Sequence, residues 1–277
     1  MRWPYLLPAA ALILVAAGIS AALFVSNGNV SSARDQSVIR TNSAEPARAV
    51  AARPAGDVCQ GLLQRPESSG PRVFSSHYTQ QAEAKGITIV ASEGVDSKAL
   101  AVAQETIEAM FANNELAKPL ADEGAYVIIA DGLEGILDLP EFGCLEDDAV
   151  ANRVSHACGI ADRADYPVAT VNERDLLGEK RGPCGGLNIL YHELGHLVQG
   201  WSLDAQDYFD VKYYYQSALD AGKYRNFYAA TNPNEYFAEA TQAYFIGNDL
   251  AGKQDRDWLK KYDPQIFELL DRVYKGR

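Results

Sequence analysis

The sequence is poor in the residues that mark several classes of protein. Only four cysteines occur among 277 residues, too few for a scaffold built on disulfides. Lysine and arginine total 25 against 37 acidic residues, for a net charge of -12, which is the opposite of the balance in nucleic-acid binders. One long apolar run is present, whereas a polytopic membrane protein needs several. Because 47% of the residues are apolar, an extensively disordered chain is excluded and a globular domain is predicted.

The single long apolar run lies at the N-terminus. Residues 6–25 are apolar except for Pro8, Gly18 and Ser20, and twenty helical residues span about 30 Å, the thickness of a bilayer core. Arg2 before the run predicts that the body of the protein lies outside the cytoplasm. A cleaved signal peptide is the equal alternative. Residues 1–25 are therefore expected to export the protein, which is then membrane-anchored, or secreted or periplasmic after cleavage.

The apolar run is followed by a linker and then by an acidic body. Residues 26–56 are mostly Ser, Asn, Ala, Arg and Pro, which is typical of a flexible linker. Residues 57–277 hold 20 of the 25 basic and 35 of the 37 acidic residues. In an oxidising compartment the even cysteine count favours two disulfides, with all three pairings open. The four cysteines are Cys59, Cys144, Cys158 and Cys184.

Patterning in the body predicts an α+β domain in which strands come before most of the helices. Alternation and β-branched residues indicate strands at 86–91 and 126–130, with a short one near 168–171. The rest of 131–185 is rich in Gly, Asp and Pro and is expected to be mostly loop. Helices are expected from Asp96 or Ser97 to 112, at 187–199 with Gly200 as its terminating residue, and at 204–221, 233–247 and 264–275. This order predicts two sub-regions with a cleft between them near residue 190.

One motif in the body carries chemistry. His192-Glu193-Leu194-Gly195-His196 has the form H-E-x-x-H and lies within the predicted helix at 187–199. Residues i and i+4 share a helix face, so His192 and His196 can bind one zinc ion while Glu193 acts as the general base. The alternative is a pair of core-facing histidines without a metal.

A catalytic zinc ion requires a third protein ligand. Gln199 and Ser202 stand where a metzincin has its glycine and third histidine, and no methionine follows the motif. The remaining histidines, His77 and His156, precede the motif in loop-like sequence and are weaker candidates. An acidic ligand downstream of the motif is therefore favoured.

Two downstream acids share one face of a predicted helix. Glu235 and Glu239 are four residues apart, among the apolar neighbours Phe237, Ala238 and Ala240. Carboxylates on an apolar helix stripe cost desolvation energy unless they meet a cation or hydrogen-bond donors. We favour Glu235 as the third ligand and Glu239 as the acceptor of the free N–H of a ligating histidine. The reverse assignment and a solvated acidic face are the alternatives.

These segments together resemble the gluzincin branch of zinc metallopeptidases, and within it the catalytic domain of anthrax lethal factor and its relatives. That pattern is H-E-x-G-H, then a tyrosine, Thr-Asn and E-F-F-A-E-A, and the matching stretch here runs from Tyr228 to Ala240. The resemblance covers about residues 187–246, and the upstream sequence shows no match. It implies a zincin-like domain of two subdomains, with zinc on His192, His196 and Glu235. It also implies that Tyr228, seven residues before Glu235, stabilises the oxyanion.

The function expected from the motif and the resemblance is that of a zinc-dependent endopeptidase acting on peptides or proteins outside the cytoplasm. A zinc-folded binding module without catalysis is one alternative, against which Glu193 speaks because a structural zinc site needs no general base. An effector or toxin delivered to another cell is the other. No nucleic-acid partner is expected from so acidic a body.

Overall fold

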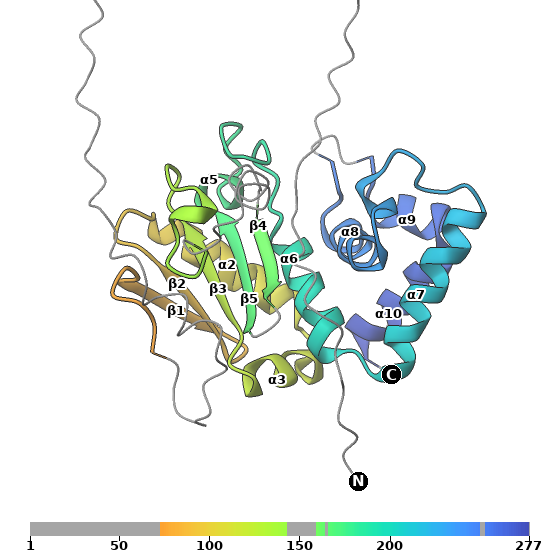
Figure 1. Cartoon of the computed structure of the whole chain (residues 1–277), viewed down its shortest axis with the longest axis horizontal. Helices are drawn as coiled ribbons and strands as arrows, with labels where there is room; N and C mark the ends of the chain where they lie inside the picture. Colours follow the sequence, from red (N-terminus) through yellow and green to blue (C-terminus); the bar gives the residue numbers. More distant parts are fainter. Residues whose placement is uncertain (1–72, 143–158, 164–165, 250–252, 277) are drawn as a thin grey trace, which may run out of the picture.

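The computed structural model describes residues 73–142, 159–163, 166–249 and 253–276 (Figure 1). A small sheet with its helices comes first, and only helices follow it in the described part of the chain. The α+β prediction is therefore confirmed. The predicted N-terminal anchor or signal peptide, the linker and Cys59, Cys144 and Cys158 lie outside the described residues.

The sheet has five strands in the order β1-β2-β3-β5-β4. The central strands β2, β3 and β5 are parallel to one another, and β1 and β4 pair with them antiparallel at the two edges. This order places β4 at one edge of the described sheet. The strand bounds are β1 Gln80–Ala84, β2 Ile87–Ala91, β3 Tyr126–Ala130, β4 Gly159–Arg163 and β5 Tyr166–Asn172.

Apolar side chains cover both faces of the sheet, so its central strands are buried. In β3 the side chains of Val127 and Ile129 join the main core, which includes the buried face of α2 (Ser97–Met110). Tyr126 and Ile128 point to the opposite face, into a smaller core. This alternation follows from the two-residue period of a strand. The smaller core also contains Tyr78, Val90, Ala130, Ile136, Leu139, Phe142 and Val168.

The strands predicted at 86–91 and 126–130 are confirmed by β2 and β3. The prediction for 131–185 missed several elements among its described residues: β5 extends beyond 168–171 at both ends, and β4, a 3₁₀ turn at Ile136–Asp138 and the short helix α5 (Glu173–Leu176) also form. Strand β1 was not expected either. Its sequence, QQAEA, has half-exposed and exposed side chains on the outer strand of the sheet, so tertiary pairing rather than local apolar alternation defines it.

The helix predicted at 187–199 begins later than expected and does not end at Gly200. Helix α6 covers Leu190–Leu197 and passes into the π-helical segment η2, Val198–Ser202. Gly200 lies inside η2 and does not end the helix, because the chain continues to wind and the Leu203 N–H donates to the Val198 carbonyl at 3.0 Å. The prediction of Gly200 as the terminating residue is wrong.

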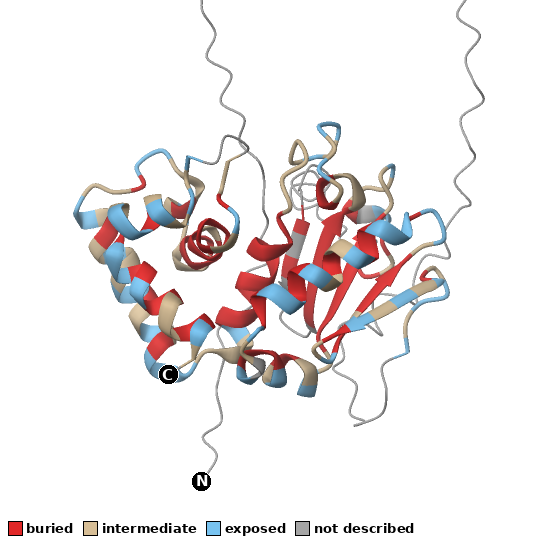
Figure 2. Ribbon diagram, turned by 180° about the vertical axis from the view of Figure 1, so that it is seen from behind, coloured by how far each residue is buried: buried red, intermediate tan, exposed pale blue. Residues whose placement is uncertain are grey.

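In the C-terminal part, the other helices pack around α8. Helix α8 contacts α6, α7, α9 and α10, and α6 also contacts strands β4 and β5. All eight residues of α6 are buried, and Figure 2 shows this helix between the sheet and the C-terminal helices. Two helices, α3 (Asn114–Asp122) and α9, were not expected. The other bounds are α7 Ala205–Asp220, α8 Pro233–Phe245, α9 Arg256–Tyr262 and α10 Pro264–Lys275.

The described residues bear only partly on the predicted membrane span and on the predicted disulfides. Among these residues no helix has the length and apolarity needed to cross a bilayer. Cys184 is disulfide-bonded. Because the other three cysteines lie outside the described residues, the disulfide pairing stays a prediction.

Candidate metal centre

At the start of α6, a side chain accepts a backbone N–H that has no partner within the helix. The Leu190 N–H donates to Asn188 Oδ1 at 3.1 Å, and Asn188 Nδ2 donates to Thr106 Oγ1 on α2 at 3.1 Å. This ties the start of α6 to the helix that covers the sheet. His192, Glu193 and His196 therefore project from a helix that is fixed at its N-terminus and buried along its length.

Helix α8 begins with a cap that also positions one of the predicted ligands. Asn232 Oδ1 accepts the N–H groups of Asn234 at 2.9 Å and Glu235 at 3.0 Å. Pro233 occupies the first turn, where its missing N–H costs nothing and its fixed φ suits a helix. Glu235 therefore lies in a well-defined first turn and is 1% exposed.

Helices α6 and α8 approach closely because the motif contains a glycine. A Cβ atom added to Gly195 would lie 3.2 Å from Ala238 Cα and 3.2 Å from Thr241 Cβ. These separations are tighter than ordinary carbon–carbon contacts. Small residues at the crossing therefore let α8 bring Glu235 up to the two histidines on α6.

Three buried atoms converge where the two helices meet. His192 Nε2 and His196 Nε2 are 3.1 Å apart. Glu235 Oε2 lies 3.2 Å from His192 Nε2 and 3.4 Å from His196 Nε2. Ligand atoms about 2.0–2.1 Å from a tetrahedral zinc ion are about 3.3–3.4 Å apart. The triangle therefore has close to the size of one face of a zinc coordination tetrahedron, and a set of two imidazoles and one carboxylate is a donor set of catalytic zinc.

The charges in the cluster favour a cation. Both Glu193 carboxylate oxygens and Glu235 Oε2 are buried and accept no hydrogen bond of good geometry from the described residues. Burial raises the pKa of Glu193 to about 8. Burial also acts to raise the pKa of Glu235, but His192 and His196 outweigh it and hold this pKa below its usual range. Burial acts to lower the pKa of His192, but Glu235 and Glu239 outweigh it and raise this pKa to about 10. Without metal, a proton on His192 therefore compensates the buried acids, and a bound cation would take its place.

Glu239 and Tyr228 lie on two sides of His192. Glu239 Oε1 is 3.2 Å from His192 Nδ1, so the Nδ1–H can donate to this carboxylate and leave the Nε2 lone pair directed at the cluster. The ring of Tyr228 is centred 6.5 Å from the ring of His192, with 33° between the two planes. The structure thus brings together all six residues that the sequence analysis selected: His192, Glu193, His196, Tyr228, Glu235 and Glu239.

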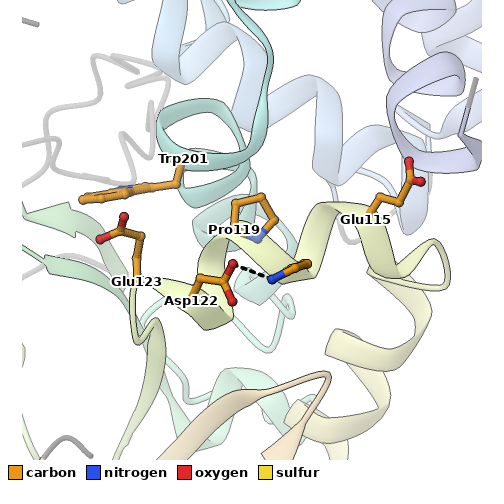
Figure 3. A pocket seen from close by; sticks show the side chains of 6 residues that line it. Glu115, Pro119, Asp122, Glu123 and Trp201 are labelled. Carbon is orange, nitrogen blue, oxygen red and sulfur yellow. Dashed lines mark hydrogen bonds and ion pairs between the residues drawn. The ribbon is translucent and has the colours of Figure 1, made fainter. Parts of the chain in front are cut away.

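The weaker candidates from the sequence are not part of this cluster. His77 Nε2 lies 3.2 Å from Glu134 Oε1 near the start of the sheet, and His156 lies outside the described residues. A separate pocket opens between α3 and η2 (Figure 3), lined by charged side chains, Pro119 and the indole of Trp201. It contains none of the six clustered residues. The predicted cleft near residue 190 stays a prediction.

Sequence reasoning missed one residue that borders the cluster. Gly159, the first residue of β4, is so close to α6 that an added Cβ would lie 2.7 Å from Glu193 Oε1 and 2.6 Å from Ile189 Cδ1. The only sequence signal is a glycine that begins a β-rich stretch, which occurs in many turns. An edge strand thus passes directly beside the carboxylate of the motif.

An α+β domain with H-E-x-x-H on the buried helix α6 and a glutamate presented by α8 defines a zincin-type domain. Residues 79–273 match the family model described as anthrax toxin lethal factor, N- and C-terminal domain, so the chain belongs to that family. The family is zinc-dependent in general. The match extends far upstream of 187–246, so the expectation of no upstream match is wrong; the sheet contains no catalytic motif that a single sequence could reveal. A comparison with curated proteins finds no match.

Proposed function

We propose that this protein is a zinc-dependent endopeptidase that hydrolyses peptide or protein substrates outside the cytoplasm. The observation that carries the proposal is the buried triangle formed by His192, His196 and Glu235, with the carboxylate of Glu193 beside it. The location is supported by the N-terminal apolar run and by the disulfide at Cys184, which suits an oxidising compartment.

The three residues of the triangle would hold zinc, which when bound supplies a Lewis acid and lowers the pKa of water to near neutral. Glu193 has the properties of the general base. Its carboxylate is buried without a hydrogen-bond donor among the described residues, and burial raises its pKa to about 8. This pKa belongs to the metal-free site. A zinc ion beside Glu193 would lower it, so that the ionised carboxylate could accept a proton from water and return it to the leaving amine.

Tyr228 and Glu239 have supporting roles in this proposal. The Tyr228 hydroxyl would donate a hydrogen bond to the oxyanion that develops on the substrate carbonyl, and its ring lies beside His192. Glu239 would fix the tautomer of His192 through its contact with Nδ1 at 3.2 Å. Neither role needs a change in the position of α6 or α8.

The edge strand β4 offers a place for an extended peptide. It is the outermost strand beyond β5 in the described sheet, and its first residue, Gly159, is in contact range of Glu193. Peptides commonly bind by adding a strand to such an edge through main-chain hydrogen bonds. This placement would bring a peptide bond next to the base without demanding a particular side chain.

The experiment measures zinc content and cleavage of an unfolded general substrate by the purified full chain. Wild-type protein should contain one zinc ion per chain and cleave the substrate, and Glu193→Gln should keep the zinc but lose at least ~10²-fold in kcat, the scale of general-base catalysis. His192→Ala should lose both. Zinc-loaded wild type that leaves the substrate intact would favour the binding module, and zinc retained by His192→Ala would exclude the proposed site.

Membership of the lethal factor family favours a second candidate, a protease effector delivered to another cell. The chemistry would be the same and only the place of action would differ. Fractionation of the producing cells and their medium separates the two, because an envelope protease stays with the membrane or periplasm. An effector is recovered in recipient cells.

A further inference from the structure

The loop between α7 and α8 carries Tyr228 and contains a strained residue. Tyr224 has φ 58°, a left-handed conformation that is unusual for a bulky residue. It is 4% exposed, so the strained backbone is held inside the protein rather than at a free loop tip. Such outliers persist only where the surrounding structure fixes them, and they gather at functional sites.

Helix α9 contacts the first part of this loop. The Tyr224 N–H donates to the Tyr262 hydroxyl at 2.8 Å. The ring of Phe227, the residue directly before Tyr228, stacks on Trp258 with centroids 5.9 Å apart and 22° between planes. Trp258 in turn stacks on Tyr262 at 4.7 Å and 17°.

The fixed turn leads directly into the segment that contains Tyr228. The Phe227 N–H donates to the Tyr224 carbonyl at 2.9 Å, and the Thr231 N–H donates to the Tyr228 carbonyl at 2.9 Å. The direction in which the chain leaves residue 224 therefore contributes to the position of Tyr228 relative to His192. The Tyr215 hydroxyl of α7 contributes as well, since it donates to the Ala230 carbonyl at 2.8 Å. A looser turn at 224–227 would move the phenol without moving α6 or the start of α8.

We infer that Tyr262 and Trp258 on α9 are positioning residues that clamp the strained turn at Tyr224 and so hold the Tyr228 hydroxyl in the site. The inference rests on the proposed function of Tyr228 as oxyanion donor. The clamp acts from outside the metal cluster, since neither α9 residue is among the groups that surround the two histidines. It gives α9 a role beyond covering the core.

The test is a double-mutant cycle on kcat in the full-length zinc-loaded protein. Tyr262→Phe removes only the acceptor of the Tyr224 N–H, and Trp258→Leu removes the ring stack while keeping apolar bulk. Each should lower kcat about 3- to 10-fold, the range of one lost neutral hydrogen bond, with KM and zinc content unchanged. In a Tyr228→Phe background neither substitution should lower kcat further, because the hydroxyl that the clamp positions is already gone.

A second measurement does not depend on activity. Amide hydrogen exchange at Phe227–Thr231 should accelerate in Tyr262→Phe while exchange in α6 and α8 stays at the wild-type rate. The matched control is Tyr126→Phe, which removes a tyrosine hydroxyl that donates to Glu141 Oε1 at 3.2 Å in the smaller core, away from the loop, and should change neither kcat nor loop exchange.

Equal loss of kcat in both backgrounds, or unchanged loop exchange in Tyr262→Phe, would overturn the clamp. Absence of cleavage by wild type would instead contradict the proposed function, and loop exchange would still decide whether α9 holds the turn.

Discussion

Two glutamates of the cluster occupy environments that give them different chemistry. Burial raises the pKa of Glu193 to about 8, whereas the pKa of Glu235 is held low because it faces two imidazoles. The proposed zinc site needs a proton acceptor and a charged ligand, and the separated pKa values agree with these roles for Glu193 and Glu235. The same contrast predicts measurable behaviour in the metal-free protein.

The buried carboxyl of Glu193 should make the stability of metal-free protein depend on pH. Because its pKa is raised in the folded state to about 8, its stabilising contribution is complete below the unfolded value of about 4.3. It is lost as pH rises through the folded value. Glu193→Gln should therefore gain Tm relative to wild type as pH increases from about 4.3 to about 8. Thermal unfolding in EDTA measures this; a difference in Tm that is constant across the range would contradict it.

The two acids on α8 should respond differently to removal. Glu235 Oε2 lies 3.2 and 3.4 Å from the two Nε2 atoms, whereas Glu239 contacts only Nδ1 of His192. Glu235→Ala should give an almost metal-free, inactive protein. Glu239→Ala should keep the metal with affinity or activity reduced ~10–100-fold, the usual effect of an outer partner. Zinc titration of both variants, each checked for folding by circular dichroism, measures this. If Glu239→Ala loses the metal and Glu235→Ala retains it, the assignment is reversed.

At the scale of elements, the α6–α8 crossing decides whether the ligands meet. Gly195→Ala adds a methyl group 3.2 Å from Ala238 Cα and 3.3 Å from Thr241 Cγ2. Alanine favours the helix by about 1 kcal/mol, but overpacking costs typically about 1–3 kcal/mol and separates the helices. We expect zinc affinity to fall about tenfold, since 1.4 kcal/mol corresponds to a factor of ten, while Tm without metal changes little.

A second substitution, Thr241→Ser, tests whether steric contact at the helix crossing causes the loss of zinc affinity. Thr241→Ser removes Cγ2, one of the three atoms that the new side chain would meet, while Ala238 Cα and Thr241 Cβ stay in place. Adding it to Gly195→Ala should therefore recover part of the zinc affinity. Isothermal titration with zinc measures all three variants. No recovery in the double variant would show that contact with the Thr241 methyl group is not the cause of the lost affinity.

Helix and strand patterns could be predicted wherever a segment carries its own apolar periodicity. Strand β3 is apolar throughout, and α2 has Asp96 as its cap and Leu100, Ala103 and Ile107 on its buried face. Strands β1 and β4 and helix α9 could not be predicted, because the first two are edge strands with polar residues and α9 has seven residues. Their identity depends on neighbours that are distant in sequence.

The candidate site was more predictable than the fold around it. Fixed spacing places His192 and His196 on one helix face, and the two acids on α8 likewise need only the helix period. The position of Tyr228 followed from a family resemblance alone, since several tyrosines lie nearby. The closeness of Gly159 to Glu193 and the contacts of α9 with the loop could not be predicted, because they arise from packing between separate elements.

At the scale of the whole molecule, the proposed metal joins the two sub-regions. His192 and His196 belong to α6, which packs on β4 and β5, and Glu235 belongs to α8, which packs on the C-terminal helices. A ligand that binds only the folded state stabilises it by about 4 kcal/mol at a concentration 1,000 times Kd. Each kcal/mol raises Tm by about 2–4 °C in a domain of 150–250 residues. A single ion should thus affect the unfolding of both parts together.

Removal of the metal should therefore lower Tm by roughly 8–16 °C when zinc-saturated protein is compared with protein in EDTA. The sheet and the C-terminal helices should lose stability in the same transition, because α6, which carries two ligands, packs on the sheet and α8, which carries the third, packs on the C-terminal helices. Differential scanning calorimetry, with and without EDTA, measures the shift. Glu235→Ala should show no EDTA effect, and Tyr228→Phe should show the full effect because the phenol is not a ligand. A Tm that is the same with and without EDTA would mean that no metal bridges the two helices.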